Sequence, residues 1–472
     1  MVFSSLTFLY FFLPLTLIFY YISPRRRWRN AVLLLASLLF YSWGEPKYLL
    51  LMLAASAEAY AGGLALHHFQ LIGDDKRRKA AFIITLVLLT ANLFVFKYLG
   101  FTAESLGKLL GRRFALAEIA LPIGISFYTF QIISYVIDLY RGEIAVQRNY
   151  LRLLLYMSFF PQLIAGPIVR YKTVAEEIVS RRESLEDAMA GSRRFIIGLA
   201  KKVLIANGAA ELAELIYAGG AGFGTAFYWL AAVAYTLQIY FDFSGYSDMA
   251  IGLGRIFGFH FLENFNYPYA ALSVTDFWRR WHISLSSWFR DYVYIPLGGN
   301  RVGRARWIFN ILLVWALTGL WHGASWNFVL WGLYYGLILV LEKLALGKAL
   351  ARLPGLCRWL YTAIVVTVGW VIFDLTDFPQ LLGALRMMFS FTPSDYLGVL
   401  TADAGTLYSF VYIPLGLIFM LPPPRRLVSL IERYESATVF CVLQCLFYFA
   451  LLFLCVAFIL SSSFNPFIYF RF

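Results

Sequence analysis

Charged residues are scarce in this chain of 472 residues: they make up only 14%, whereas hydrophobic residues make up 61% and aromatic residues 19%. A soluble domain contains roughly 25% charged residues. Apolar runs such as 81–96 and 441–460 approach the ~20 residues that a helix needs to cross a bilayer. The composition therefore excludes a soluble globular protein and predicts an all-α polytopic membrane protein.

Acidic residues are also few, numbering 27 against 40 lysines and arginines, which leaves a net charge of +13. The basic residues gather in short clusters between apolar runs, at 25–29, 76–79, 181–182, 201–202 and 425–426. This pattern is typical of the excess of lysine and arginine in the cytoplasmic loops of membrane proteins. We attribute the basic charge to membrane topology, and the sequence predicts no nucleic-acid partner.

Cysteine is rare, and metal-binding patterns are absent from the sequence. The four cysteines, Cys357, Cys441, Cys445 and Cys455, lie in or beside apolar segments without the spacing of a disulfide framework or a zinc site. No pair of histidines has the HxxxH or HExxH spacing of a helical metal site. The sequence therefore predicts no metal centre and no bound cofactor.

The first apolar run, 5–22, precedes the basic cluster 25–29, whereas a signal peptide carries its positive charge before the apolar region. It is expected to remain as a first span, with the N-terminus outside and Arg25 in the cytoplasm. Further apolar segments are predicted at 30–43, 47–66, 80–97, 119–140, 150–168, 192–216, 225–257, 307–321, 326–346, 358–375, 405–421 and 437–462. No internal repeat, long linker or soluble domain is visible in the sequence. We therefore predict a single membrane domain over 1–472, with a motif core at about 120–345 and an external tail at 463–472.

Two regions differ from simple membrane spans. In 150–168, two prolines and a glycine interrupt the apolar run and basic residues flank it, so this segment is expected to enter the membrane and return. The second region, 276–306, is too charged to span. Its large apolar residues form one stripe on a helical wheel, comprising Trp278, Trp281, Leu285, Trp288 and Tyr292. This stripe predicts an amphipathic helix at the cytoplasmic side of the membrane, with His282 at its polar boundary.

Only five histidines occur, and two of them, His282 and His322, lie in aromatic, glycine-punctuated surroundings. An ionisable group at membrane depth is expensive, so a functional role is the default hypothesis there. Burial keeps an imidazole in its basic form near neutral pH, which suits a general base that takes a proton from an attacking hydroxyl. Gly319 and Gly323, beside His322, are expected to let a substrate approach the backbone closely. A purely structural histidine is the alternative at both positions.

Carboxylates within apolar stretches leave other functions open. Asp242 and Asp248 lie in YFDFSGYSDMAIGLG, where they suit either a proton path in a transporter or a role in orienting helices and lining a polar tunnel. The residues alone are equally compatible with an enzyme and with a transporter or flippase for a lipid-linked sugar or an acyl carrier. A non-catalytic scaffold is a third alternative. Inverted repeats and paired broken helices, which favour transport, are not visible in the sequence.

Two long motifs resemble a known family. They are DFWRRWHISLSSWFRDYVYIPLGGNR, from residue 276, and GLWHGASWNFVLWGLYYG, from residue 319. Together they are similar to the signature of the membrane-bound O-acyltransferase (MBOAT) superfamily. Within it, MVFSSLTFLYFFLP, LPIGISFYTFQIISYVIDLYRG and LIAGPIVRY resemble the alginate O-acetylation (AlgI-type) subfamily. The likeness extends from residue 1 to about 345 and returns at the C-terminal FIYFRF.

This resemblance implies a fold and a set of site residues. The fold would be a ring of about 11 transmembrane helices, with re-entrant and amphipathic helices, around a central funnel. His322 matches the family's principal histidine and is expected to act as the general base or transfer residue. His282 matches the accessory histidine and is expected to support catalysis. We further predict five residues that line the tunnel, namely Asp242, Asp248, Trp321, Trp326 and Arg279.

The resemblance also implies a reaction. The donor is expected to be an acyl thioester, most simply acetyl-CoA, whose acetyl group crosses the bacterial inner membrane for O-acetylation of an exported polysaccharide such as alginate. Outside, an SGNH-type O-acetyltransferase and the polysaccharide synthesis machinery are the expected partners. Tyr469, in FNPFIYFRF, is similar to an acyl-accepting tyrosine, and an interfacial aromatic anchor is the alternative. Other surface glycans suit the motifs equally well.

Overall fold

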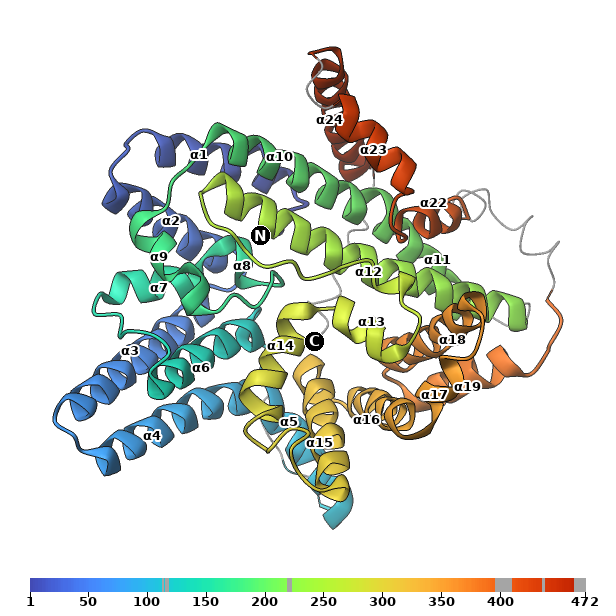
Figure 1. Ribbon diagram of the computed structural model, residues 1–472, viewed down its shortest axis with the longest axis horizontal. Coiled ribbons are helices and arrows are strands. Elements are labelled where there is room, and N and C mark those ends of the chain that lie inside the picture. The colour runs from blue at the N-terminus through green and yellow to red at the C-terminus, as the bar shows by residue number, and fades with distance from the viewer. Residues whose placement is uncertain (113, 115–118, 219–222, 395–409, 435–437, 462–472) are drawn as a thin grey trace. The chain divides into compact units, whose positions relative to one another are not determined.

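The computed structural model describes residues 1–112, 114, 119–218, 223–394, 410–434 and 438–461. Every regular element in these ranges is a helix, and they contain no strand (Figure 1). The predicted all-α class is therefore confirmed. The helices form two compact units, the first comprising Met1–Ser192 with Ala250–Leu262 and the second Arg193–Met249 with Glu263–Phe472. The single membrane domain expected over 1–472 stays a prediction.

The first unit contains the N-terminal helices. They are η1 (Phe8–Phe12), α1 (Leu13–Tyr21), α2 (Arg26–Ser42), η2 (Pro46–Tyr48), α3 (Leu49–Leu71), α4 (Asp75–Leu93), η3 (Phe94–Tyr98), α5 (Leu99–Leu110), α6 (Ile125–Arg141), α7 (Tyr150–Ser158), α8 (Phe160–Leu163) and α9 (Tyr171–Ser180). Local signals set several of their ends. Asp74 caps α4 by accepting a hydrogen bond from the backbone N–H of Arg77, and Gly142, with φ of 75°, ends α6.

Helix α10 (Leu185–Ala200) continues from the first unit into the second, and α12 (Thr225–Ile256) contributes residues to both. The other helices belong to the second unit. They are η4 (Lys201–Ala206), α11 (Asn207–Ala218), η5 (Pro268–Ala270), α13 (Val274–Arg280), α14 (Ile283–Phe289), η6 (Arg290–Tyr294), α15 (Arg304–His322), α16 (Trp326–Leu341), η7 (Glu342–Leu346), α17 (Gly347–Leu350), α18 (Gly355–Asp374), α19 (Phe378–Phe389), α22 (Tyr412–Phe419), α23 (Arg425–Tyr434) and α24 (Thr438–Ser461).

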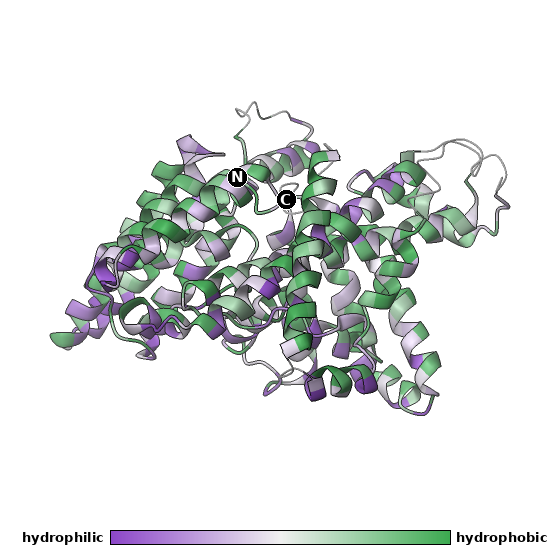
Figure 2. Cartoon of the chain, turned by 90° about the horizontal axis from the view of Figure 1, so that it is seen from above, coloured by the Kyte–Doolittle hydropathy of each residue, from purple (hydrophilic) through white to green (hydrophobic). Residues whose placement is uncertain are grey.

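Five helical stretches in the described ranges are long and apolar enough to cross a membrane. They are Pro46–Leu71, Asp75–Leu110, Trp326–Leu350, Gly355–Asp374 and Thr438–Ser461. Figure 2 shows hydrophobic residues along most of the helices. On α24, Leu443, Phe449 and Phe453 are examples of large apolar side chains that are mostly exposed, by 57, 74 and 76%. So much exposed apolar surface requires a lipid environment, as expected for a membrane protein.

The interruption predicted within 150–168 is confirmed. Helix α7 ends at Ser158, only the four-residue α8 follows, and irregular backbone extends over 164–170. Most of this backbone is buried, so its polar groups require partners within the protein. The Tyr156 hydroxyl donates to the Val169 carbonyl oxygen at 2.9 Å, and the Gln162 side-chain amide donates to the Tyr156 carbonyl oxygen at 2.6 Å. Its re-entry into the membrane stays a prediction.

The expectation of one amphipathic surface helix in 276–306 is wrong in two respects. The helix breaks after Arg280, because Trp281 is extended and His282 has φ of 44°, before α14 begins at Ile283. Its aromatic stripe faces protein, since all five of its members are buried. The Trp278 ring lies 4.7 Å from that of Trp315, and the Trp281 ring 4.8 Å from that of Trp370. The stripe is therefore part of the core of the second unit.

Glycines let α15 and α16 pack closely against each other. A Cβ on Gly319 would lie 2.1 Å from the Phe328 carbonyl oxygen, and a Cβ on Gly332 would lie 2.1 Å from the Trp315 carbonyl oxygen. Small residues commonly allow such backbone approach between membrane helices. A Cβ on Gly323 would likewise lie 2.2 Å from the Phe328 ring. The expectation that Gly319 and Gly323 leave room for a substrate is therefore wrong, because Phe328 fills that space.

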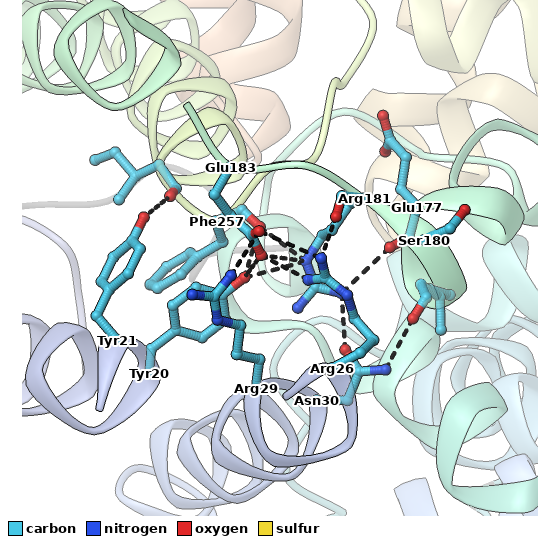
Figure 3. Close-up of polar contacts among 12 residues, drawn as sticks. Tyr20, Tyr21, Arg26, Arg29, Asn30, Glu177, Ser180, Arg181, Glu183 and Phe257 are labelled. Carbon is cyan, nitrogen blue, oxygen red and sulfur yellow. Dashed lines mark hydrogen bonds and ion pairs between the residues drawn. The ribbon is translucent and has the colours of Figure 1, made fainter. Parts of the chain in front are cut away.

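A polar cluster in the first unit joins α1 and α2 to the loop before α10 (Figure 3). Its centre is Glu183, which pairs with Arg26 and with Arg29 at 2.6 Å each. The Tyr20 hydroxyl donates to Glu183 at 2.5 Å and accepts a hydrogen bond from the buried Arg181 guanidinium at 3.1 Å. Burial alone raises the pKa of Glu183, but hydrogen bonds from Arg26 and Tyr20 and the nearby positive charges leave this pKa below its ordinary value.

Candidate active site

His322 is the last residue of α15, which ends where Gly323 adopts an extended conformation. Its imidazole is buried among aromatic rings from three helices. The ring centroids of Trp321, Trp331 and Phe373 lie 4.9, 5.2 and 5.2 Å from that of His322. These neighbours come from α15, α16 and α18, so tertiary packing positions the side chain.

His282 occupies the break between α13 and α14. Its φ of 44° places it in the left-handed region, which is uncommon for a residue other than glycine and persists only where the surroundings enforce it. The imidazole is 1% exposed, and its ring centroid lies 4.6 Å from that of Phe243 on α12 and 5.9 Å from that of Trp321. Its Nδ1 lies 3.2 Å from Oδ1 of Asn264. Burial lowers the pKa of His282 to about 3, so the ring is neutral near pH 7.

The structure brings His282 and His322 together: their ring centroids are 6.5 Å apart, and both side chains line one cavity of about 280 Å³. We refer to these two residues as the histidine pair. Both come from the second unit, in which residues of α13, α14, η6, α15, α16 and η7 line the cavity. The catalytic roles assigned to the two histidines stay predictions.

The cavity combines an apolar wall with a cationic rim. The wall includes Trp278, Leu285, Phe289, Ile311, Val314, Trp315 and Leu339. The cationic rim comprises Arg279, Arg290 and Lys343, all of which are exposed, and Arg290 also contacts Asp291 at 2.6 Å. No carboxylate is among the described residues that line the cavity. The site therefore suits an anionic ligand whose reactive end is held against apolar surface and the two imidazoles.

The two carboxylates predicted to line a tunnel lie elsewhere. Asp242 is buried and pairs with Lys202 at 2.8 Å, while Asp248 pairs with Lys201 at 2.6 Å and with Arg194 at 2.8 Å. Neither carboxylate is among the residues that line the cavity of the histidine pair. Both form ion pairs between α12 and the preceding helical segment, which joins these elements within the second unit.

The remaining predicted residues are distributed as follows. Arg279 lines the cavity. Trp321 is not among the lining residues, but its ring contacts the rings of both histidines. Trp326 begins α16, is 52% exposed and does not line the cavity. Tyr469 lies outside the described residues. Within those residues, no group of three or more histidine, cysteine and carboxylate side chains is placed to hold a metal ion.

Sequence reasoning missed Asn264 and Glu342. Their side chains bond to the segment 274–284, which contributes several residues to the cavity. Asn264 contacts His282 through its side chain, as described above. Glu342 is buried at the end of α16, and its carboxylate accepts hydrogen bonds from the backbone N–H groups of Val274 at 2.8 Å and Thr275 at 2.9 Å. It therefore caps the N-terminus of α13. A lone carboxylate in the apolar run 326–346 was the one available signal for its role.

A comparison with family models matches residues 139–374 to the membrane-bound O-acyltransferase family, MBOAT. This range contains the histidine pair and every residue that lines the cavity. The chain belongs to this family and is an O-acyltransferase, which confirms the family resemblance drawn from its motifs.

Several bacterial acyltransferases are similar to the chain. The probable alginate O-acetylase AlgI of Pseudomonas aeruginosa is 44% identical over 83% of this chain and 75% of that protein. The peptidoglycan O-acetyltransferase of Helicobacter pylori is 33% identical over 82% of this chain and 80% of that protein. The teichoic acid D-alanyltransferase of Bacillus subtilis is 30% identical over 54% of this chain and 68% of that protein.

Proposed function

We propose that this protein transfers an acetyl group from a cytosolic thioester, acetyl-CoA, for the O-acetylation of an exported polysaccharide. The observation that carries the proposal is the cavity itself. Two buried imidazoles, with ring centroids 6.5 Å apart, line it together with an apolar wall, and three exposed cationic side chains line it as well. Acetyl-CoA has the matching chemistry, because it joins a small apolar acyl thioester to a polyanionic phosphate-bearing group.

In this proposal, His322 acts as the general base. It takes the proton of an attacking hydroxyl while the hydroxyl oxygen forms a bond to the thioester carbonyl carbon. The carbon–sulfur bond then breaks, and the leaving thiolate receives that proton, which yields a free thiol and an oxygen ester. His282 supports this step from the same cavity, 6.5 Å away between ring centroids, and the rings around His322 exclude water that would otherwise hydrolyse the thioester.

The cationic rim is proposed to hold the phosphates of the donor. Arg279 and Lys343 are exposed and line the cavity. No carboxylate is among the other described residues that line it. Arginine binds phosphate through paired N–H groups and lysine binds it as a point charge. A neutral, lipid-linked acyl donor has no anionic group to pair with these cationic side chains. The cationic rim therefore favours a donor that carries phosphate.

The proposed topology places the protein in the bacterial inner membrane, with a ring of about 11 transmembrane helices around a central funnel. Basic clusters at 25–29 and 76–79 support cytoplasmic loops there, and they leave the N-terminus and the tail at 463–472 outside. Tyr469 in this tail would accept the acetyl group, and an extracytoplasmic transferase of the SGNH type would pass it to the polymer. The Pseudomonas relative supports alginate as the acceptor, and the Helicobacter relative supports peptidoglycan as the second choice.

The test is the O-acetyl content of the exported polymer in a strain that lacks the chromosomal gene and carries either wild-type protein or His322→Ala. We expect the variant to lose polymer-bound acetyl ester while its membrane abundance is unchanged. His68→Ala, which removes an exposed histidine remote in sequence from the motifs, is the matched control and should retain acetylation. Undiminished acetylation by His322→Ala would refute the assignment and favour a scaffold.

A further inference from the structure

Asn264 holds the positions of three donors around a single oxygen atom. Its Oδ1 accepts hydrogen bonds from the Ser284 backbone N–H at 3.2 Å and from the Ser284 hydroxyl at 2.9 Å. The third group is Nδ1 of His282, at 3.2 Å. In addition, the Ile283 N–H donates to the Asn264 carbonyl oxygen at 3.0 Å. Asn264 is fully buried, so these contacts are shielded from water.

The hydrogen bond from the Ser284 backbone N–H shows which side-chain atom of Asn264, oxygen or nitrogen, faces His282. A backbone N–H can only donate, so the atom that faces it must be the amide oxygen and not the amide nitrogen. An amide oxygen can only accept, so the nearby Nδ1 of His282 must carry the ring proton. We propose that Asn264 is a positioning residue that keeps His282 in its Nδ1–H tautomer, so that Nε2 serves as a hydrogen-bond acceptor for an amide N–H of the acyl donor.

The position of Nε2 supports this role. His282 lines the cavity, and Nε2 is buried without a hydrogen-bond partner among the described residues. A buried acceptor left without a partner is costly, and an amide N–H of the acyl donor would supply the partner. The left-handed backbone of His282 adds a second cost that the hydrogen bonds of Asn264 and Ser284 help to offset. The unpartnered Nε2 and the positive φ of His282 both occur where this residue of the first motif lies beside His322 of the second motif.

The proposed role of His282 requires a neutral ring. Burial lowers its pKa, which suits a fixed acceptor and does not suit a group that must hold a proton during the reaction. The charged and titratable groups that line the cavity with His282 are His322 on α15, Arg279 on α13, Arg290 and Tyr294 on η6, and Lys343 on η7. His282 would orient the acyl donor, and His322 would receive the proton of the attacking hydroxyl.

This inference rests on the proposed function and makes a distinct prediction for substitutions of His282. In His282→Gln, the side-chain carbonyl oxygen reaches the place of Nε2 and can accept a hydrogen bond, but it cannot carry a proton. We expect acetylation by His282→Gln to remain within about tenfold of wild type and that by His282→Leu to fall by ~100-fold or more. Equal loss in both variants, with folded protein present, would refute the role of neutral acceptor.

Asn264→Asp tests the positioning role through a pH profile. The aspartate can still accept from Nδ1–H, but its negative charge raises the pKa of His282, so that Nε2 becomes protonated at higher pH. The acid limb of the kcat/KM profile should therefore move to higher pH. Ser284→Ala is the matched control, because it removes one donor to Asn264 and adds no charge, and its profile should coincide with that of wild type.

The assay uses membrane vesicles that carry each full-length variant together with the extracytoplasmic transferase, with radiolabelled acetyl-CoA as the probe, and measures thiol release together with ester formed on added alginate. Size-exclusion chromatography in detergent reports the folded fraction of each variant. If the pH profiles of kcat/KM coincide for Asn264→Asp and Ser284→Ala, the inference is refuted. Acetyl transfer by the wild-type protein would still uphold the proposed function in that case. Wild-type vesicles without transfer would overturn the proposed function and this inference with it.

Discussion

The ion pair between Lys202 and Asp242 offers a decisive test of how the second unit is held together. The pair is 2.8 Å long, and the two side chains are only 4% and 2% exposed. Asp242→Asn and Lys202→Met each leave the other charge buried without its counter-ion. Removing one member of a buried pair destabilises a protein by about 3–5 kcal/mol, because the remaining charge keeps its desolvation cost.

The double variant Lys202→Met with Asp242→Leu removes both charges together with their desolvation cost. We expect it to recover most of the stability lost in either single variant, since a buried pair and an apolar replacement of similar volume are often nearly equal in stability. Thermal unfolding in detergent, followed by size-exclusion chromatography, measures the difference. The exposed pair Lys108–Glu104, at 2.7 Å, is the control, and its loss should cost no more than about 0.5 kcal/mol.

The same variants separate a structural role of Asp242 from a role in the tunnel. If Asp242 serves only the ion pair, the double variant folds and keeps acetyltransferase activity. A folded double variant without activity would show that the carboxylate acts in the reaction. Single variants as stable as wild type would refute the energetic reasoning.

Three further predictions concern packing, pH and the donor. Gly319→Leu should abolish folded protein on size-exclusion chromatography, because even a Cβ there would lie 2.1 Å from a carbonyl oxygen of α16, whereas Gly355→Leu, with open space around it, should be tolerated. Glu183 has a lowered pKa when folded, so its contribution is present above its unfolded pKa and disappears as the pH falls through its folded pKa. Glu183→Gln should therefore be less stable than wild type at neutral pH and lose less stability in acid, as thermal unfolding at a series of pH values would measure. Arg279→Ala and Lys343→Ala should each raise KM for acetyl-CoA by about tenfold with little change in kcat, and unchanged KM values would contradict a phosphate-binding rim.

The class of the protein and the break after α7 were predictable from local sequence. Long apolar runs with few charges identify membrane helices without knowledge of their neighbours. The break after α7 was predictable for the same reason, since the two prolines and the glycine in 150–168 act on their own backbone. The positions of His282 and His322 in long motifs also predicted, through a family resemblance, that they belong to one site, and the structure brings them together.

Features that depend on tertiary contacts were not predictable. Helical periodicity predicted one continuous helix across His282. The positive φ that breaks this helix is not predictable from the residue type. The glycines beside His322 suggested space, but only the approach of α16 shows that Phe328 occupies it. Asn264 contacts His282 from a separate segment, and a single sequence carries no signal for such a pairing. The buried ion pair of Asp242 likewise depends on how η4 packs against α12.

The most direct test of the account is a structure of the protein with a thioether analogue of acetyl-CoA, which cannot transfer its acyl group. We predict density for the acyl end between His282 and His322, with Nε2 of His282 within hydrogen-bond reach of an amide N–H of the analogue and the phosphates in contact with Arg279 and Lys343. Analogue bound at another place, with the cavity of the histidine pair empty, would contradict the claim that acyl transfer takes place there.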